Sequence, residues 1–308
     1  MKKITNVAII GTGKAAYQHY KCLKKIKIKK IFIITRKINN KKKNKYFTSN
    51  TFFVEGIQNI PKTIDAIIVA TPWYLNDKFL KIFSNYKIPI LFEKPIGFSL
   101  RDLNLIQNKN KKFVGLNRRF FDTISYVKKI LKNKKYNILD VEVRISEKYK
   151  LFEKRFGKLN NKIFYFSSIH IIDLIIYLFG EPNKLNHLKK NNNSLNKFFN
   201  LYYKKFHLSL NIYDNTYENN SILIRFTNGE IIMLKPLEKL YHYKNLQIKS
   251  FQNKKIYIPK LKKVIIENQK TLKPGFLAQM RFFIKNKLSL NIREYIKTQK
   301  ILNFISNA

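Results

Sequence analysis

The chain has few residues of several kinds, and each shortage excludes a class of protein. A single cysteine, Cys22, rules out a disulfide framework within the chain and any metal site built from several cysteines. No apolar run approaches the roughly 18 residues that a membrane-spanning helix needs. The apolar run near the N-terminus, residues 7–10, is also shorter than the roughly 7–15 residues of a secretory signal core. We therefore expect a cytoplasmic protein with no membrane partner.

Acidic residues are scarce as well: 18 Asp and Glu stand against 62 Lys and Arg, which gives a formal net charge of +44. A nucleic-acid binder would gather such charge on one face or in a recognisable motif. Here the lysines occur in every segment, and the sequence holds no zinc finger, aromatic RNA-recognition signature or basic zipper. Lys, Asn, Ile, Phe and Tyr, whose codons are rich in A and T, are all abundant, so we interpret the charge as a compositional bias. The sequence thus predicts no nucleic-acid partner, although the basic surface would attract anionic substrates.

The first 119 residues show short apolar runs that alternate with helical stretches. Continuous apolar runs of this length are typical of strands buried on both faces of a sheet. Strands that alternate with helices at this spacing indicate a parallel, doubly wound sheet. We expect strands at residues 4–10, 31–35, 66–72, 89–95 and 113–117, and helices at 14–25, 76–86 and 99–107.

The pattern changes after about residue 120. We expect a helix at 122–133, an alternating strand at 138–145, an apolar helix at 168–179 and a polar loop at 188–198. Strands are then expected at 206–213, 221–227, 230–235, 243–251 and 255–258, with a hairpin turn at Asn228-Gly229 and one or two helices over 276–305. Residues 1–119 are therefore predicted to form an α/β domain with a doubly wound parallel sheet. Residues 120–308 are predicted to form a second, α+β domain with a predominantly antiparallel open sheet.

Glycine is rare, with 9 residues in the chain, yet two glycines lie two positions apart directly after the first predicted strand. The segment Gly11-Thr12-Gly13-Lys14-Ala15-Ala16 matches a dinucleotide-binding turn, Gly-x-Gly-x-x-Ala. Gly11 permits the tight turn, Gly13 lets the backbone approach a pyrophosphate, and the small Ala16 lets the helix pack near the strand. The alternative is an ordinary strand-to-helix turn that binds nothing. A P-loop is excluded, because it requires glycine in place of Ala8 and Ser or Thr in place of Ala15.

The end of the second predicted strand bears on the choice between NAD and NADP. NAD sites usually carry Asp or Glu there to bond the ribose 2′-hydroxyl. This chain carries Thr35, Arg36 and Lys37 instead. No carboxylate on this strand would repel a 2′-phosphate, and the Arg36 guanidinium could bind one. The sequence therefore favours NADP, with NAD as the alternative, unless Arg36 and Lys37 belong only to the general excess of basic residues.

Several further segments line up in order along the chain. They are "GTGKAAYQH" at 11–19, "DAIIVATP" at 65–72, "FEKP" at 92–95, "VGLNRRF" at 114–120, "SSIHIIDLIIYLFGEP" at 167–182 and "PGFLAQMRFFIKN" at 274–286. Together they resemble the motifs of the Gfo/Idh/MocA oxidoreductases over nearly the full length of the chain. The Glu-Lys-Pro within "FEKP" is the most specific single match.

This resemblance implies an N-terminal Rossmann domain, a C-terminal α/β domain with an open sheet, and a nicotinamide that meets the substrate between them. It implies an NAD(P)-dependent dehydrogenase or reductase of a sugar, sugar phosphate or nucleotide sugar, with surface polysaccharide biosynthesis as one setting, and a homo-oligomer formed through the exposed face of the second sheet. Lys94 would lie beside the nicotinamide, and His170 would be the acid/base. The implied cofactor-binding residues are Gly11, Thr12, Gly13, Lys14, Ala15, Ala16, Thr35, Arg36, Ala70, Thr71, Pro72, Glu93 and Lys94, and the candidate substrate contacts are Asn117, Arg118, Arg119 and Asp173.

The predicted helix at 168–179 supports a role for His170 independently. Between Ile169 and Phe179 every residue is apolar except His170, Asp173 and Tyr177, which share one face. A helix that is apolar all round belongs in the interior, where unpaired polar groups cost about 1–3 kcal/mol each. A histidine suits the removal of a hydroxyl proton, and a nearby lysine can hold and polarise the oxygen. The alternative is a buried His–Asp pair with a structural role.

The chain departs from the family pattern at three positions. Phe166 stands where many of the dehydrogenases carry an Asp four residues before the histidine, Ser168 replaces a common glycine, and Asn76 replaces a histidine after the "ATP" strand. A non-catalytic, dinucleotide-binding regulatory protein on the same scaffold is therefore a second hypothesis. The five histidines show no paired ligand spacing, so we expect no metal site.

Overall fold

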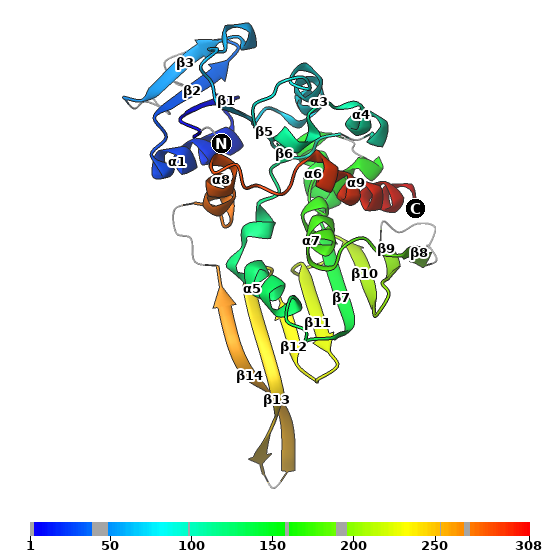
Figure 1. Cartoon of the computed structure of the whole chain (residues 1–308). Coiled ribbons are helices and arrows are strands. Elements are labelled where there is room, and N and C mark those ends of the chain that lie inside the picture. Colours follow the sequence, from blue (N-terminus) through cyan, green and yellow to red (C-terminus); the bar gives the residue numbers. More distant parts are fainter. Residues whose placement is uncertain are drawn as a thin grey trace. The chain divides into compact units, whose positions relative to one another are not determined.

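A computed structural model describes residues 3–38, 49–97, 99–157, 160–188, 196–252, 254–267 and 272–308 (Figure 1). The chain divides into two compact units. Unit 1 comprises Met1–Phe120 and Gln269–Ile301, and unit 2 comprises Phe121–Asn268 and Leu302–Ala308. The predicted second domain is continuous over 120–308, whereas the structure assigns Gln269–Ile301 to unit 1.

An apolar helix explains why the chain returns from unit 2 to unit 1 near its end. Helix α8 (Phe276–Ile284) buries Met280 and Phe283 in the same apolar cluster as Leu23 of helix α1 (Lys14–Ile26). Burying two such side chains contributes about 1.5–3 kcal/mol each. The sequence shows that 276–305 is amphipathic but not which core its apolar face joins, because the partner lies far away along the chain.

Unit 1 is built on a six-stranded parallel sheet in the order β3-β2-β1-β4-β5-β6. The doubly wound sheet is thus confirmed. Strand β3 was not among the predicted strands, because it is an edge strand whose residues are only partly buried and so lack a continuous apolar run. The strands are β1 (Asn6–Ile10), β2 (Lys30–Thr35), β3 (Thr51–Glu55), β4 (Ala66–Val69), β5 (Ile90–Phe92) and β6 (Lys112–Val114).

Helices α1, α3 (Trp73–Ile82), α4 (Leu100–Leu105) and α8 belong to this unit, as do the first ten residues of α9 (Ile292–Asn307). Helix α3 begins three residues before the predicted start at 76. Pro72 precedes its first turn, where a missing N–H costs nothing and the fixed φ suits a helix start.

Unit 2 is built on an eight-stranded sheet in the order β14-β13-β12-β11-β7-β10-β9-β8. Among the strand pairs that the structure describes in this sheet, only β7–β10 is parallel, so the prediction of a predominantly antiparallel sheet is confirmed. The expected turn at Asn228-Gly229 joins β11 and β12 as a hairpin. The strands are β7 (Ile138–Glu147), β8 (Lys184–Leu188), β9 (Lys197–Tyr202), β10 (His207–Asp214), β11 (Ser221–Phe226), β12 (Ile231–Leu234), β13 (Lys239–Phe251) and β14 (Lys254–Ile266).

Two predictions on this sheet differ from the structure. The segment 188–198 was expected to be a loop, but β8 ends at Leu188 and β9 begins at Lys197, and residues 189–195 lie outside the described part. Strand β14 is much longer than the predicted 255–258. It is an edge strand with almost every residue exposed, so no buried face imposes alternation on its lysine-rich sequence.

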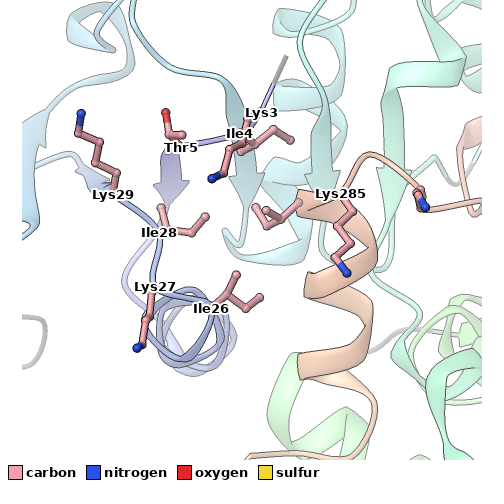
Figure 2. Close-up of a pocket in the computed structure, with 10 residues that line it drawn as sticks. Lys3, Ile4, Thr5, Ile26, Lys27, Ile28, Lys29 and Lys285 are labelled. Carbon is pink, nitrogen blue, oxygen red and sulfur yellow. The ribbon is translucent and has the colours of Figure 1, made fainter. Parts of the chain in front are cut away.

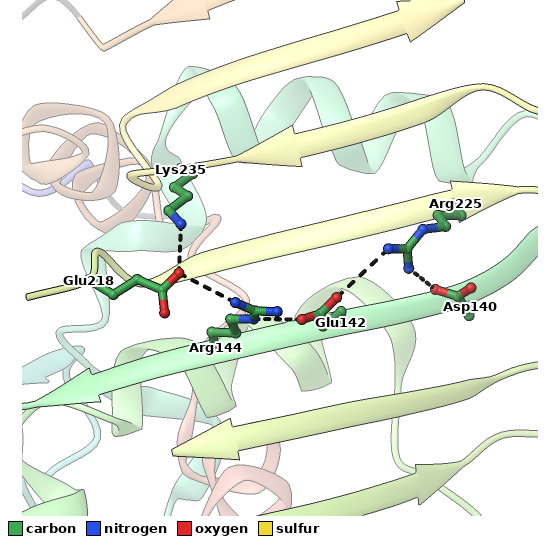
Figure 3. A network of polar contacts seen from close by, with 6 residues as sticks. All are labelled: Asp140, Glu142, Arg144, Glu218, Arg225 and Lys235. Carbon is green, nitrogen blue, oxygen red and sulfur yellow. Dashed lines mark hydrogen bonds and ion pairs between the residues drawn. The ribbon is translucent and has the colours of Figure 1, made fainter. Parts of the chain in front are cut away.

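The two faces of this sheet differ in character. Along β7, Val141, Val143 and Ile145 are buried, while the residues between them are partly exposed. Helices α5 (Asp122–Leu131) and α7 (Ile169–Phe179) lie across one face (Figure 1). The open face carries a ladder of ion pairs, defined by Asp140, Glu142, Arg144, Glu218, Arg225 and Lys235 (Figure 3).

Candidate functional site

The strand order of unit 1 reverses between β1 and β4, and the carboxyl ends of these strands mark the place where open α/β sheets bind ligands. Gly11 follows β1 with φ +111°, a conformation that L side chains rarely adopt. A Cβ at Gly11 would lie 2.5 Å from the carbonyl oxygen of Ala70, which follows β4. The predicted role of Gly11 in the tight turn therefore has two physical causes, its backbone angle and this close contact.

Gly13 plays a different part from Gly11. Its φ of −75° is accessible to any residue, and a Cβ built on it meets no heavy atom within 4 Å. It caps helix α1, and no side-chain hydrogen bond covers this helix start, while Ala16 in the first turn is fully buried. Open space beside uncapped helix amides fits a pyrophosphate, because those N–H groups and the helix dipole both favour an anion. The residues present thus fit a dinucleotide.

The end of β2 holds a carboxylate that the sequence pattern missed. Thr35 is the last residue of β2 and pairs in register with Glu55, the last residue of β3. Arg36 and Glu55 are both exposed. The sequence-based prediction of NADP rests on the residues at the end of β2 alone. Because β3 was not predicted, the sequence could not show that Glu55 lies beside the position where Asp or Glu usually bonds a ribose.

Asn76, noted above only as a departure from the family, holds the segment that carries Lys94. Its side chain is fully buried. The Nδ2 amide donates to the carbonyl oxygens of Glu93 at 2.8 Å and Pro95 at 3.0 Å, and Oδ1 accepts from the Thr71 hydroxyl at 2.9 Å. One side chain therefore fixes both neighbours of Lys94 to the end of β4.

A second contact joins the same segment to the dinucleotide-binding turn. His19, on helix α1, is 1 % exposed, and its Nε2 lies 2.6 Å from Oε1 of Glu93. Its ring also packs 5.3 Å from the ring of Phe276. The helix that begins at Gly13 and the residue before Lys94 are thus held together by a short, nearly buried hydrogen bond.

The far end of this segment is anchored by helix α9. The carbonyl oxygen of Ile96 accepts hydrogen bonds from the Tyr295 hydroxyl at 3.1 Å and from Nε2 of Gln299 at 2.9 Å. Tyr295 and Gln299 are both fully buried. Lys94 itself is partly exposed and precedes a cis peptide bond to Pro95. The backbone of residues 93–96 is therefore held on both sides of an accessible ammonium group.

The structure brings all thirteen predicted cofactor-binding residues to the carboxyl edge of this sheet, where they follow β1, β2, β4 and β5. Asn117 and Arg118 lie in a short 3-10 helix (Asn117–Phe120), and Nδ2 of Asn117 donates to the carbonyl oxygen of Pro274 at 2.7 Å. Arg119, also considered for substrate contact, is buried.

Unit 2 holds the other predicted residues, His170 and Asp173, both on helix α7. The prediction of a buried helix is confirmed, since eight of its residues are buried, including Asp173. His170 is partly exposed. His170 belongs to unit 2 and Lys94 to unit 1.

A buried carboxylate that the sequence pattern also missed supports the start of α7. Glu147, at the end of β7, is fully buried, and its Oε1 accepts hydrogen bonds from the backbone N–H of Ser168, at 2.7 Å, and from the Ser168 hydroxyl. A negative charge at a helix N-terminus is favourable. Ser168 lies two residues before His170, so this contact positions the turn that carries the histidine. In the sequence, Glu147 is a single glutamate at the end of an alternating strand, and such a residue alone does not predict a functional role.

Comparisons with known proteins agree with this architecture. Residues 5–113 match the Gfo/Idh/MocA family model, described as an oxidoreductase family with an NAD-binding Rossmann fold. No curated protein matches the sequence. Among the described residues, no helix is both long and apolar enough to span a membrane, and no three or more His, Cys, Asp or Glu side chains are grouped to hold a metal ion.

Solved structures similar to nearly the whole chain include several dehydrogenases. A dehydrogenase from Chromobacterium violaceum has a TM-score of 0.79 at 13 % identity, with 99 % of this chain and 95 % of that chain covered. The WlbA dehydrogenase of the same organism, in complex with NADH and UDP-GlcNAcA, has a TM-score of 0.72 at 14 % identity, covering 98 % and 93 %. A myo-inositol dehydrogenase from Corynebacterium glutamicum has a TM-score of 0.69 at 15 % identity, covering 97 % and 95 %. At such identities the likeness shows the fold alone.

Proposed function

We propose that this chain, whose residues 5–113 match the Gfo/Idh/MocA oxidoreductase model with its NAD-binding Rossmann fold, transfers a hydride between a nicotinamide and a sugar-type secondary alcohol or ketone. The hydrogen-bond frame around Lys94 carries this proposal. His19 and Asn76 hold the residues on either side of Lys94 next to the dinucleotide-binding turn. A lysine so placed serves a reaction at the end of a bound dinucleotide.

In the oxidative direction the substrate carbon loses its C–H bond with both electrons, the O–H proton leaves, and a C=O bond forms. The bound nicotinamide supplies the hydride acceptor. We assign the Lys94 ammonium to the substrate oxygen, where it holds the alcohol and stabilises negative charge as the proton leaves. We assign His170 to receive that proton, and to return it in the reductive direction. Asn117, Arg118 and Asp173 are the proposed substrate contacts.

For the cofactor we propose NADP, with NAD as the alternative. Arg36 is exposed directly after β2 and can pair with a 2′-phosphate. Glu55 acts in the opposite direction, since a carboxylate at this edge would accept a hydrogen bond from the 2′-hydroxyl of NAD and repel the phosphate. The ratio of the KM for NADP to the KM for NAD, measured in Arg36→Ala and in Glu55→Gln, tests which side chain determines the cofactor preference. Arg36→Ala should shift this preference toward NAD, and Glu55→Gln should shift it toward NADP.

For the substrate we propose a sugar phosphate or nucleotide sugar, with surface polysaccharide biosynthesis in the cytoplasm as the setting. The net charge of +44 favours an anionic substrate over a neutral polyol. The WlbA dehydrogenase, which shares the fold, was solved with the nucleotide sugar UDP-GlcNAcA.

We also propose that the chain forms a homo-oligomer through the open face of the unit 2 sheet. Two copies that each carry +44 repel one another, so an interface needs a region where charge is balanced. The ladder in Figure 3 provides one, because its three carboxylates and three cations alternate within 2.5–3.8 Å contacts such as Arg144–Glu142 at 2.5 Å and Arg225–Asp140 at 2.7 Å. Sedimentation should show a dimer or larger assembly that Asp140→Lys with Glu142→Lys dissociates; a monomer at all concentrations would contradict this.

The test of the function is turnover with the full-length chain. Nucleotide sugars, sugar phosphates and polyols are screened with NAD and NADP while nicotinamide absorbance is followed. We expect turnover that Lys94→Ala and His170→Gln each reduce by about 10²-fold or more, while the exposed control Lys87→Ala keeps it. Dinucleotide binding without turnover, and without any effect of Lys94→Ala, would support the regulatory alternative instead.

A further inference from the structure

Unit 1 contains a pocket at the opposite end of its sheet from the dinucleotide-binding turn (Figure 2). It lies where β1 begins, α1 ends and α8 ends, and its volume is about 620 Å³. Small-molecule sites usually measure about 300–1,000 Å³. Helix α1 starts directly after Gly13 and ends at this pocket, so its 13 residues separate the two places by about 20 Å.

The floor of the pocket is apolar. Four isoleucines contribute to it, from the start of β1, the end of α1, the following turn and the end of α8. Two of them are buried in the core, while Ile26 and Ile284 are only partly buried and so leave apolar surface in contact with water. The four are Ile4, Ile26, Ile28 and Ile284.

The rim is cationic. Half of the ten lining residues are lysines, against 62 Lys and Arg among 308 residues in the chain, and none of the ten is acidic. All five lysines are exposed and come from three separate segments. The nearby acid, Asp65, is buried, and its Oδ2 accepts three hydrogen bonds from Thr5 and Asn6 at 3.0 Å. The five are Lys3, Lys27, Lys29, Lys285 and Lys287.

Two helix C-termini reach the pocket, and some of their terminal carbonyl oxygens already accept backbone hydrogen bonds. The N–H of Lys27 donates to Leu23 and Lys24 at the end of α1, and the N–H of Lys285 donates to Arg281 at the end of α8. Each helix C-terminus carries about half a negative charge, so the two together offset about one of the five ammonium charges. The rim is therefore strongly positive around an apolar floor.

We propose that this pocket binds a small amphiphilic anion, with an acyl or aryl body on the isoleucine floor and a carboxylate, sulfonate or phosphate among the lysines. A purely ionic ligand would leave the exposed isoleucine surface in water, and a neutral apolar ligand would leave the mutual repulsion of the lysines unrelieved. Only a molecule with both parts satisfies the floor and the rim. The site is independent of the dinucleotide and of the proposed hydride transfer.

Calorimetric titration of the full-length chain tests the proposal with three probes: decanoate, decanol and inorganic phosphate. Decanoate should bind at least about tenfold more tightly than either of the others, because it alone has both parts. Lys3→Gln with Lys285→Gln should weaken decanoate binding about tenfold, and so should Ile26→Ser with Ile284→Ser. The matched control, Lys249→Gln with Lys255→Gln on the exposed β13–β14 hairpin, removes the same charge and should change it less than about twofold.

Three results would overturn the proposal. Equal affinity for decanoate and decanol would show no role for the rim, and equal losses in the pocket and hairpin variants would show a general charge effect. Binding to phosphatidylserine vesicles that depends on Lys3 and Lys285, without binding of monomeric decanoate, would make the surface a membrane contact. Thermal unfolding of each variant establishes that it is folded, and unchanged NADP affinity keeps this test separate from the dinucleotide site.

Discussion

Nε2 of His19 lies 2.6 Å from Oε1 of Glu93, a residue 74 positions further along the chain. This contact ties the first helix to the segment that carries Lys94. With the ring nitrogen Nε2 donating to the carboxylate, helix α1 is linked directly to the residue that follows β5. The glycine turn and Lys94 thus belong to one hydrogen-bonded frame, although they lie far apart in the sequence.

Replacing His19 should therefore impair activity more than folding. His19→Ala leaves a nearly buried carboxylate without this donor, which costs about 1–3 kcal/mol of unfolding free energy. Misplacement of Lys94 by about 1 Å could reduce kcat/KM by about 10²-fold. Steady-state kinetics and urea unfolding measure the two effects. The exposed His207→Ala should alter neither, and a His19→Ala enzyme with full kcat/KM would show that the frame does not position Lys94.

Asn76 provides a second test of the same frame. Asn76→Ala leaves the carbonyl oxygens of Glu93 and Pro95 and the Thr71 hydroxyl without their shared partner. We expect a loss of about 2–3 kcal/mol in stability and a fall in kcat that is larger than the rise in KM for the dinucleotide, since the turn at Gly13 is untouched. The exposed Asn104→Ala is the control. A large rise in cofactor KM with unchanged kcat would contradict this assignment.

The buried carboxylate of Glu147 should affect His170 through the start of α7. Glu147→Gln keeps an oxygen for the Ser168 N–H but removes the negative charge. Loss of a negative charge lowers the pKa of a neighbouring histidine, so the acid limb of the kcat/KM profile should move toward lower pH. Glu142→Gln, on the open face of the same strand, should leave the profile unchanged. A profile that moves toward higher pH, or does not move, would show that Glu147 has only a structural role.

A buried network on unit 2 predicts a loss of stability in acid. Burial lowers the pKa of His242, Lys262 lowers it further, and Glu230 opposes the shift. Burial alone would raise the pKa of Glu230, but Lys262 and His242 more than offset it and the pKa lies below its ordinary value. Nε2 of His242 lies 2.8 Å from Glu230, which leaves Nδ1 to accept a hydrogen bond from the Tyr126 hydroxyl at 2.9 Å.

Both depressed pKa values act in the same direction. The unfolded chain takes up a proton on His242 more readily than the folded chain does, so this contribution is complete above about pH 6.5 and is lost as the pH falls below it. The contribution of Glu230 is lost at lower pH, below about 4.3. Urea unfolding between about pH 8 and pH 5, roughly the range in which histidines titrate, should show a decline in stability that His242→Phe flattens and His207→Gln does not. An equal decline in the His242 variant would assign it to other groups.

How far the sequence predicts this molecule depends on whether a feature is local. The turn at Gly11 and Gly13 was predicted because the glycine requirement and the strand before it lie within ten residues. Glu55 was missed because its edge strand has no buried periodicity, and that omission left the argument for NADP incomplete.

The partners of Asn76 and Glu147 were missed for another reason. Asn76 bonds residues 17 and 19 positions away, and Glu147 bonds a residue 21 positions away. No spacing rule connects such positions, because the loops between them can follow many paths. The resemblance identified which residues to consider, Lys94 and His170 among them, but not the side chains that hold their segments in place.

The most direct measurement of the central claim is calorimetric titration of NADP and NAD into the Gly13→Val chain. Gly13 has an ordinary φ and open space at its Cβ, so valine should lower stability by at most about 1 kcal/mol, or about 2–4 °C in Tm. Its side chain would occupy the space proposed for the pyrophosphate, and dinucleotide affinity should fall by about 10²-fold or more relative to the wild-type chain. A folded Gly13→Val protein that binds either dinucleotide as tightly as the wild type would contradict the account.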